Sequence, residues 1–408
     1  MHKIERLLQT LAPKGVEFRK LGEVCDFQKG KSITKKAVTF GKVPVISGGR
    51  QPAYYHNEAN RSGETIAISS SGVYAGYVSY WDIPVFLADS FSVSPKQKTL
   101  MPKYLFHYLT TQQDAIHATK STGGIPHVYS KDLQNFLIPI PPLEIQQEIV
   151  KILDAFTELN TELNTELKAR KKQYEYYQNM LLDFKDIHSN HKDAKMNAKT
   201  YPKPLQTLLQ TLAPKGVEFK KIGELFKRNK GINITAAQMK ELHSEIGKVR
   251  IFVGGATKAD INYKDISKKD IINCESVIIK SRGNIGFEYY NQPFSHKNEI
   301  WSYSSKTNQM LVKFLYYYLS NNQYYFQKLA QSSSVKLPQL SVSDTDEYEV
   351  PVPPLEIQQE IVKILDQFSA LTTDLQAGIP AEIKARKKQY EYYREKLLTF
   401  KPFKSLKP

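Results

Sequence analysis

Residues 141–184 read PPLEIQQEIVKILDAFTELNTELNTELKARKKQYEYYQNMLLDF, and much of this text returns at residues 353–400. The segment PPLEIQQEIVKILD begins at residues 141 and 353, and KARKKQYEYY begins at residues 168 and 384. A third segment, LLQTLAPKGVEF, begins at residues 7 and 208. Duplicated segments of this length indicate two tandem units. Each unit has a short lead-in, a globular segment and a long charged segment.

The apolar positions of residues 141–184 recur at steps of three and four, which is typical of a coiled-coil seam. Two successive steps of four fall on TELN-TELN-TELK, residues 157–168, and such a stutter locally unwinds a coiled coil. We therefore predict that helix pairing rests on Phe156, Leu159, Leu163 and Leu167 in the first copy and on Phe368, Leu371 and Leu375 in the second. Arg170 and Arg386 occupy equivalent seam positions, where they either fix the register or contact a phosphate or a partner subunit.

A helix over residues 143–184 would be roughly 63 Å long, and its narrow seam needs a partner. The second copy is the obvious partner. We expect the two helices to pair antiparallel, although the linker is long enough to allow a parallel pair. Gly378 and Pro380 predict an interruption of the second helix.

Short β-branched and aromatic runs predict strands at residues 43–47, 65–71, 77–81 and 85–89. Apolar residues at helical spacing predict a helix over residues 101–116 and a counterpart over residues 311–326. We therefore predict an α+β fold of two tandem pseudo-symmetric units. Each is a mixed α/β domain followed by a long helix, and the two helices pack as an antiparallel coiled coil.

The chain of 408 residues carries 57 Lys and Arg against 41 Asp and Glu, a net charge of +16. This surplus suggests a polyanionic partner, most simply nucleic acid; the alternative is a merely basic soluble protein. The two cysteines, Cys25 and Cys274, build neither a disulfide framework nor a Cys-rich metal site, which fits a reducing cytoplasm. No apolar run is long enough to span a membrane, and the first residues lack a signal core.

The sequence contains two partial matches to catalytic motifs, and each lacks residues that the motif requires. GKS at residues 30–32 resembles the end of a phosphate loop, but Cys25 stands where that loop needs Gly. His56 and Glu58 lack the cysteines of a zinc deaminase. No nucleophile elbow and no H-E-x-x-H motif is present. We therefore expect a non-catalytic chain without cofactor or metal.

The duplicated PPLEIQQEIVKILD, KARKKQYEYY and LAPKGVEF segments resemble the specificity subunit of type I restriction-modification systems, over essentially the whole chain. The resemblance implies two target-recognition domains separated by two helical regions that pack antiparallel. Each domain would read one half of a split, asymmetric site in double-stranded DNA. The partners would be two modification subunits, which carry adenine methyltransferase activity, and restriction subunits as optional further members.

Repeated tetrapeptides in that family set the gap between the half-sites, and TELN-TELN-TELK looks similar to such a device. Four residues add about 6 Å of helix, against about 3.4 Å for one base pair. They also rotate the helix by about 40° beyond a full turn. Deleting residues 161–164 is therefore expected to shorten the spacer and to leave both half-sites unchanged.

The repeats and the resemblance together predict the domain limits. Target-recognition domains are expected at residues 1–140 and 208–352, helical regions at 141–184 and 353–408, and a linker at 185–207. Two other functions remain open: a stand-alone DNA-binding regulator without methyltransferase partners, and a coiled-coil scaffold whose basic surface is incidental. A scaffold would show little salt dependence of DNA binding, and a pull-down of partners separates the regulator from the specificity subunit.

DNA-binding residues are expected where the two copies differ, because phosphate contacts supply affinity and base-edge contacts supply sequence. In the first copy the candidates are Lys29, Lys31, Lys35, Lys36, Arg50, Arg61, Ser70, Tyr74, Lys120, Thr122 and His127. In the second copy they are Arg228, Lys230, Lys258, Lys280, Arg282, Asn284 and Lys336. Arg282 and Asn284 are chemically suited to guanine and adenine edges. For each single residue the alternative is a solvated surface side chain.

Overall fold

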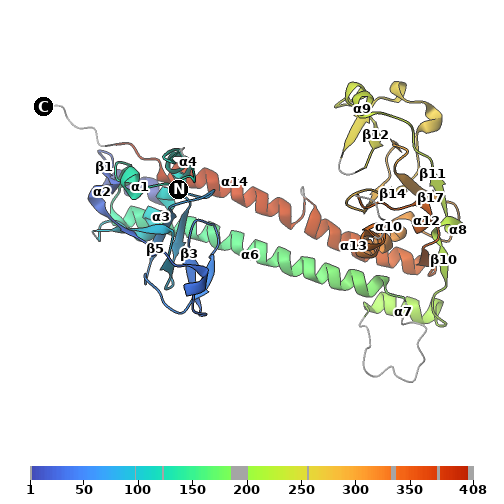
Figure 1. Ribbon diagram of the computed structural model, residues 1–408, viewed down its shortest axis with the longest axis horizontal. Coiled ribbons are helices and arrows are strands. Elements are labelled where there is room, and N and C mark those ends of the chain that lie inside the picture. The colour runs from blue at the N-terminus through green and yellow to red at the C-terminus, as the bar shows by residue number, and fades with distance from the viewer. Residues whose placement is uncertain are drawn as a thin grey trace, which may run out of the picture. The chain divides into compact units, whose positions relative to one another are not determined.

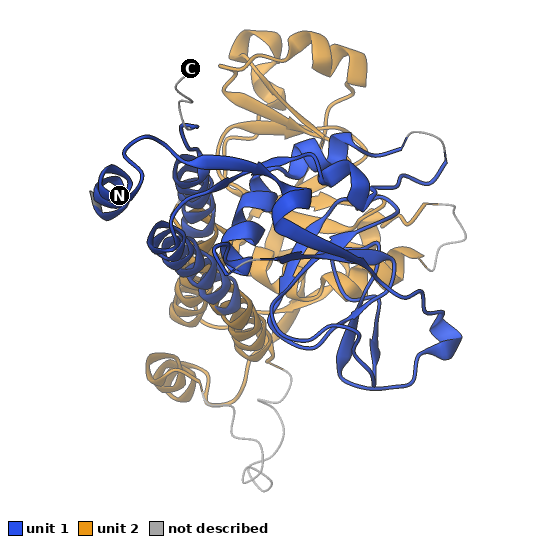
Figure 2. Cartoon of the chain, turned by 90° about the vertical axis from the view of Figure 1, so that its left-hand side faces the viewer, with its two compact units in different colours: residues 1–165, 382–408 blue, residues 166–381 orange. Residues whose placement is uncertain are grey.

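The computed structural model describes residues 2–96, 98–121, 124–184, 201–254, 257–331, 337–374 and 377–402. The chain forms two compact units (Figure 2). Unit 1 comprises residues 1–165 and 382–408, and unit 2 comprises residues 166–381. The long helix α6 (Leu143–Leu182) contributes residues to both units.

Unit 1 contains a mixed α/β domain ahead of α6 (Figure 1). Its helices are α1 (His2–Leu11), α2 (Leu21–Val24), the 3-10 turn η1 (Lys35–Ala37), α3 (Pro102–Thr111), α4 (Gln113–Ala118) and α5 (Ser130–Leu133). Its strands are β1 (Glu17–Lys20), β2 (Cys25–Lys29), β3 (Val43–Ile46), β4 (Tyr54–His56), β5 (Thr65–Ser69), β6 (Val78–Trp81), β7 (Phe86–Leu87), β8 (Ser90–Pro95) and β9 (Leu137–Ile140).

Unit 2 repeats this order of elements. Its helices are α7 (Lys203–Leu212), α8 (Ile222–Leu225), α9 (Ala236–Leu242), η3 (Tyr263–Asp265), η4 (Lys268–Asp270), α10 (Val312–Asn321), α11 (Gln323–Gln331) and α12 (Val342–Asp346). Its strands are β10 (Phe219–Lys221), β11 (Phe226–Asn229), β12 (Val249–Phe252), β13 (Lys258–Ile261), β14 (Ser276–Lys280), β15 (Gly286–Tyr290), β16 (Phe294–His296), β17 (Trp301–Ser305) and β18 (Glu349–Pro351).

The sheets of the two units have the same topology. An antiparallel sheet of order β2-β8-β5-β6 in unit 1 corresponds to β11-β17-β14-β15 in unit 2. A second sheet, β4-β3-β7, corresponds to β13-β12-β16, and in both its central strand pairs parallel with the last. The two-stranded ladders β1-β9 and β10-β18 also correspond. The predicted pseudo-symmetric α+β fold is therefore confirmed.

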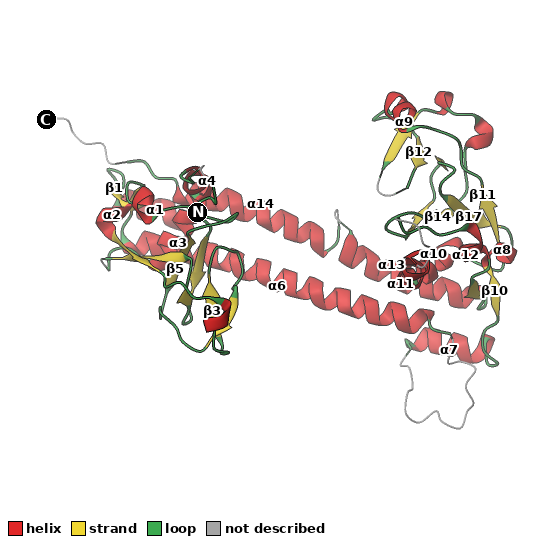
Figure 3. Ribbon diagram, viewed as in Figure 1, coloured by secondary structure: helices red, strands yellow, loops and turns green. Residues whose placement is uncertain are grey.

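Each unit packs one end of α6 against a helix from the C-terminal part of the chain (Figure 3). In unit 1, Phe156 of α6 stacks on Tyr393 of α14 (Ile379–Leu398), with ring centroids 5.5 Å apart. In unit 2, Tyr177 of α6 stacks on Phe368 of α13 (Leu355–Thr373) at 5.2 Å. The core of unit 1 joins Ile145 and Ile149 to Leu397. The two helices of unit 1 run antiparallel. Ile149 of α6 lies in one core with Leu397 of α14, whereas Phe156, later in α6, stacks on Tyr393, earlier in α14.

The second long helix is interrupted as predicted. α13 ends at Thr373 and α14 begins at Ile379, whereas α6 runs without a break for 40 residues. The sequence signals missed the short strands β1, β2, β4, β8 and β9 of unit 1. Of the segment predicted as a linker, residues 185–200 lie outside the described residues, and α7 begins at Lys203. Within the described ranges, no helix is long and apolar enough to cross a membrane.

Candidate nucleic-acid interface

Two loops of unit 1 are joined by backbone hydrogen bonds at the end of β5. The first loop, residues 70–77, follows β5, and the described residues of the second, 120–121 and 124–129, precede α5. The Gly72 N–H donates to the Pro126 carbonyl at 3.0 Å, and the Val128 N–H donates to the Ser70 carbonyl at 2.9 Å. These bonds pair Ser71 with His127 as an isolated antiparallel bridge. We call this arrangement the paired loops of unit 1.

Unit 2 builds the same paired loops from different residues. The Gly283 N–H donates to the Pro338 carbonyl and the Leu340 N–H to the Ser281 carbonyl, each at 2.9 Å. Arg282 pairs with Gln339 as Ser71 pairs with His127. Gly72 and Gly283 have φ angles of +83° and +71°, a backbone conformation that favours glycine. The shared glycine thus fixes the turn, and the residues around it are free to differ.

Side chains of helices hold the first loop of each pair in place. The Gln113 side chain donates to the Gly76 carbonyl at 2.7 Å, and the matching Gln323 donates to the Ile285 carbonyl at 2.7 Å. In unit 2 the Gln327 side-chain oxygen also accepts from the Ile285 N–H at 2.9 Å. The loops are therefore positioned by the helices behind them rather than by solvent-exposed contacts alone.

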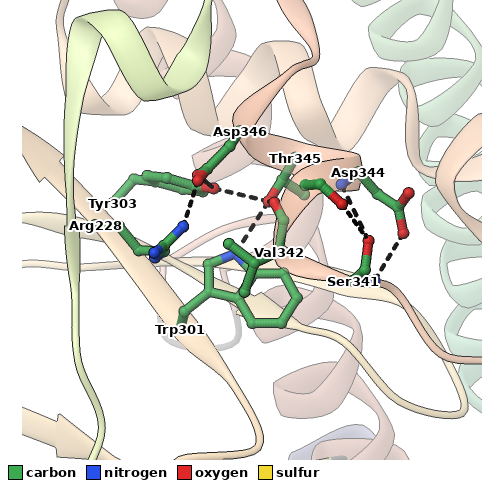
Figure 4. Close-up of polar contacts among 9 residues, drawn as sticks. Arg228, Trp301, Tyr303, Ser341, Val342, Asp344, Thr345 and Asp346 are labelled. Carbon is green, nitrogen blue, oxygen red and sulfur yellow. Dashed lines mark hydrogen bonds and ion pairs between the residues drawn. The ribbon is translucent and has the colours of Figure 1, made fainter.

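The second loop of unit 2 leads into α12, which is fixed to the sheet (Figure 4). The Trp301 indole N–H hydrogen-bonds the Thr345 hydroxyl at 3.0 Å, and the Tyr303 hydroxyl lies 2.7 Å from the same oxygen. Asp346 accepts from Tyr303 and forms an ion pair with Arg228. Arg228, a predicted DNA contact, is thus partly occupied in holding α12.

The predicted contacts of unit 1 that the structure describes fall into three groups. Lys29, Lys31, Lys35, Lys36, Arg50 and Tyr74 are exposed, and Ser70, Lys120 and His127 are half-buried in the paired loops. The Arg50 guanidinium lies over the Tyr74 ring, 4.9 Å from its centroid. Arg61 instead faces inward: it donates to the Ser92 hydroxyl and to the backbone carbonyls of Asn60, Gln28 and Lys29. Burial lowers the pKa of Arg61.

In unit 2, Lys230, Lys258, Arg282 and Asn284 are exposed. Lys258 lines a cavity of about 470 Å³ beside α9, away from the paired loops in sequence. Lys280 forms an ion pair with Glu288 at 2.6 Å across the β14–β15 ladder. Thr122 and Lys336 lie outside the described residues. The structure thus gathers Arg282 and Asn284 at one loop. Lys258 lies outside that loop but shares its cavity with Glu299, whose backbone carbonyl accepts from the Ser281 hydroxyl of the loop at 2.7 Å.

The predicted seam residues differ in burial. Leu163 is buried, Phe156, Leu159, Leu167 and Phe368 are half-buried, and Leu371 is 37% exposed. Arg170 and Arg386 make the same contacts within their own helices, each with a Glu four residues earlier and a Gln three residues later. Leu375 lies outside the described residues.

Comparison with known proteins decides the family. The model of the type I restriction modification DNA specificity domain matches residues 13–172 and again residues 214–385. This chain belongs to that family. The two matches cover most of both units, in agreement with the duplicated fold.

Two curated members of the specificity family match almost end to end. A putative type I restriction enzyme specificity subunit of Haemophilus influenzae is 29% identical over 97% of this chain and 98% of its own length. The specificity subunit of the Escherichia coli enzymes EcoR124I and EcoR124II is 26% identical over 98% and 97%. The crystal structure of a type I restriction-modification S subunit from M. genitalium has a similar fold, with a TM-score of 0.67, 20% identity and coverage of 94% and 96%.

The duplicated segment PPLEIQQ contains a buried glutamine that was not among the residues predicted from the sequence. Gln146 is fully buried; its amide donates to the carbonyls of Thr99 and Pro141 and accepts from the Met101 N–H. Gln358 makes the same three bonds, with Gln309, Pro353 and Leu311. Each glutamine ties the start of a long helix to its domain. The sequence does contain a signal for this contact, because a polar glutamine stands at the same place in both copies of the predicted seam helix.

An aspartate of the same duplicated segment, Asp154 in the first copy and Asp366 in the second, also makes matching contacts in both units. Asp154 accepts from Lys103 at 2.6 Å and lies 3.0 Å from His107 Nε2. The matching Asp366 accepts from Lys313 at 2.7 Å and from the Tyr317 hydroxyl at 2.5 Å. Burial lowers the pKa of His107 more than the Asp154 hydrogen bond raises it. For Asp154, burial acts to raise the pKa, but the bonds from Lys103 and His107 outweigh it and lower the pKa.

Proposed function

We propose that this chain selects the DNA sequence for a type I restriction-modification enzyme, and that the paired loops of each unit read one half of a split, asymmetric site. The observation that carries the proposal is the contrast within one chain. The two units share topology, the hydrogen bonds of the paired loops and the glycine of the turn, yet they differ at Ser71 and Arg282 and at His127 and Gln339. Two readers of different sequences need a common scaffold with different tips.

In this proposal the exposed lysines near the paired loops neutralise phosphates, and the loop tips contact base edges. Arg50, Lys29 and Lys31 in unit 1 and Lys230 in unit 2 are exposed and suited to phosphate contacts. Arg61 is left out of the proposed set, because its guanidinium already donates to internal acceptors. Methyl transfer and DNA cleavage belong to partner subunits, and the assembly acts in the cytoplasm.

The long helices are proposed to dock two copies of one adenine methyltransferase subunit. Tyr176 and Tyr392 occupy equivalent positions of the duplicated KARKKQYEYY segment, and they are 61% and 58% exposed. Exposed aromatic side chains that are retained in both copies suit an interface used twice by the same partner, since tyrosine is enriched at binding hot spots. The TELN repeats of α6 are proposed to set the gap between the half-sites.

The competing functions predict different dependences of DNA affinity on salt concentration. Fluorescence anisotropy of the chain in complex with its modification subunit, on a duplex that carries its site, is expected to show affinity falling about a thousandfold between about 50 and 200 mM salt, as for some six neutralised phosphates. A scaffold with an incidental basic surface would bind weakly and with a shallow slope. A stand-alone regulator would bind the same duplex steeply without recruiting a methyltransferase subunit in a pull-down.

A further inference from the structure

The paired loops of the two units differ in chemistry at matched places. Val73 follows Gly72 in unit 1, and Asn284 follows Gly283 in unit 2. On the second loop, Ile125 precedes Pro126 and Leu337 precedes Pro338. The Gly72–Pro126 and Gly283–Pro338 hydrogen bonds bring these flanking residues to the same part of each pair. The tip of unit 1 is therefore apolar on both loops, whereas unit 2 has a polar residue on its first loop.

The apolar tip of unit 1 is strongly exposed. Val73 is 81% exposed and Ile125 is 66% exposed. Single exposed apolar side chains are ordinary in proteins, but these two flank one hydrogen bond that joins two loops. Lys120 donates to the Val73 carbonyl at 3.4 Å, and Arg50 lies over the neighbouring Tyr74. An apolar tip beside cations suits an anionic partner that also presents an apolar group.

Double-stranded DNA presents one such group in its major groove. Three of the four bases offer only hydrogen-bond donors and acceptors there, and thymine adds the 5-methyl group. Valine and isoleucine side chains have no hydrogen-bonding atoms, so they contribute to base discrimination there through apolar contact. Asn284, at the matched place in unit 2, carries an amide, whose donor and acceptor are instead chemically suited to an adenine edge.

We propose that Val73 and Ile125 contact the 5-methyl group of a thymine in the half-site read by unit 1. This inference rests on the proposed function of the paired loops as base readers. It assigns Val73 and Ile125 as specificity-determining residues, which extends the set of polar candidates that the sequence suggested.

Replacement of thymine by deoxyuridine removes the methyl group and leaves every hydrogen-bonding atom of the base in place. The probe is a set of synthetic duplexes that carry the site mapped from methylated adenines, each with one thymine replaced. Binding is measured by fluorescence anisotropy, with the chain in complex with its modification subunit. One replacement, in one half-site, is expected to weaken binding about fourfold, the value for one buried methyl-sized group.

Alanine variants of the two proposed contact residues test whether they cause the weaker binding of the deoxyuridine duplex. In Val73→Ala and Ile125→Ala the ratio between thymine and deoxyuridine duplexes at that position is expected to shrink toward one. Both side chains are exposed, so neither change is expected to disturb folding. Asn284→Ala serves as the matched control: it is expected to weaken binding through unit 2 while the fourfold ratio at the unit 1 position persists.

The outcomes separate this inference from the proposed function. If the complex prefers its mapped site over an unrelated duplex but no deoxyuridine replacement changes affinity by more than about twofold, the thymine contact is wrong and the proposed function stands. A ratio that persists in both Val73→Ala and Ile125→Ala also overturns the assignment. If the complex shows no preference for the mapped site, the proposed function itself fails.

Discussion

At the scale of single residues, the environment of a side chain decides its role more than its type does. Arg50 and Arg61 are both arginines of the first globular segment, yet Arg50 is exposed and Arg61 donates to three backbone carbonyls. Gln146 and Gln147 are neighbours in one segment, yet one is fully buried and the other exposed. Such differences depend on which elements pack together, and residue types alone do not reveal them.

Gln146→Ala is expected to destabilise unit 1 by about 3 kcal/mol, because it leaves the Met101 N–H and the carbonyls of Thr99 and Pro141 without their buried partner. Urea unfolding, with hydrogen exchange to assign the transition to unit 1, measures the change. Gln147→Ala, at the exposed neighbour, is the control and should change stability by less than about 0.5 kcal/mol. Equal effects of the two substitutions would contradict the role of Gln146.

Unit 1 is also expected to lose stability as the pH falls below about 6.5, the ordinary pKa of histidine. Burial holds the pKa of His107 below that value in the folded state, so the unfolded chain binds the proton more readily. The stability that unit 1 gains from keeping His107 neutral is therefore fully present at higher pH. It declines as the pH falls through the pKa that histidine has in the unfolded chain. Asp154 adds a loss only at lower pH, as the pH falls from its ordinary pKa to its lowered one.

His107→Tyr places in unit 1 the residue that unit 2 has at the matched position, Tyr317. This variant should remove the decline between about pH 7 and 5, since tyrosine does not titrate there. Thermal unfolding at several pH values measures it. A variant whose stability declines as steeply as that of the unchanged chain would refute the histidine as its source.

At the scale of elements, the break between α13 and α14 is set by a close backbone approach. A Cβ atom at Gly378 would lie 2.5 Å from the Ala370 carbonyl oxygen and 2.9 Å from those of Asp374 and Leu371. The Gly378 N–H also donates to the Asp374 carbonyl at 3.2 Å. The interruption therefore depends on glycine at this position as well as on Pro380.

Gly378→Ala is expected to destabilise the antiparallel pairing in unit 2 by about 1–3 kcal/mol, because the backbone must shift to admit the methyl group. Urea unfolding measures the loss. The matched control is Gly286→Ala, also in unit 2, where a Cβ atom would meet nothing within 4 Å. If both variants are equally stable, the close approach does not fix the break.

Tyr176 and Tyr392 are exposed at equivalent positions of the two long helical segments. Replacing Tyr176 or Tyr392 by Ala is expected to weaken binding of the methyltransferase subunit about tenfold at the altered site, as for a typical aromatic hot spot. Because the two positions are equivalent, the two single variants should behave alike. Tyr324→Ala, a 72% exposed tyrosine of α11, is the control. Copurification in which neither helix variant loses a partner would exclude this docking surface.

Much of the helical architecture was predictable from spacing, because a seam with steps of three and four needs a partner helix and the duplicated text offered one. The strands 65–71 and 77–81 were also foreseen, although β2 and β8 were not. CDFQK and SFSVSP carry polar residues at several positions, which hides their pairing in the sheet. The paired loops were missed as a unit, since Gly72 and Pro126 lie far apart in sequence and meet only through the fold.

At the scale of the whole molecule, the compact units do not follow the order of the chain. Unit 1 includes residues 382–408, and unit 2 includes residues 166–182 of the first long helix, α6. Each domain is therefore supported by a helical segment that follows the other domain in sequence. Such an exchange couples the helices to both domains, as the proposed spacing role of the helices requires.

The proposed role of the TELN repeats in setting the gap is tested most directly by mapping methylated adenines in DNA from cells that express this chain with its modification subunit, before and after deletion of residues 161–164. The unchanged chain should yield one asymmetric site of two half-sites with a fixed gap. The deletion should keep both half-sites and shorten the gap by about one to two base pairs, because four residues span about 6 Å of helix. Altered half-sites at an unchanged gap, or a continuous recognition sequence, would contradict it.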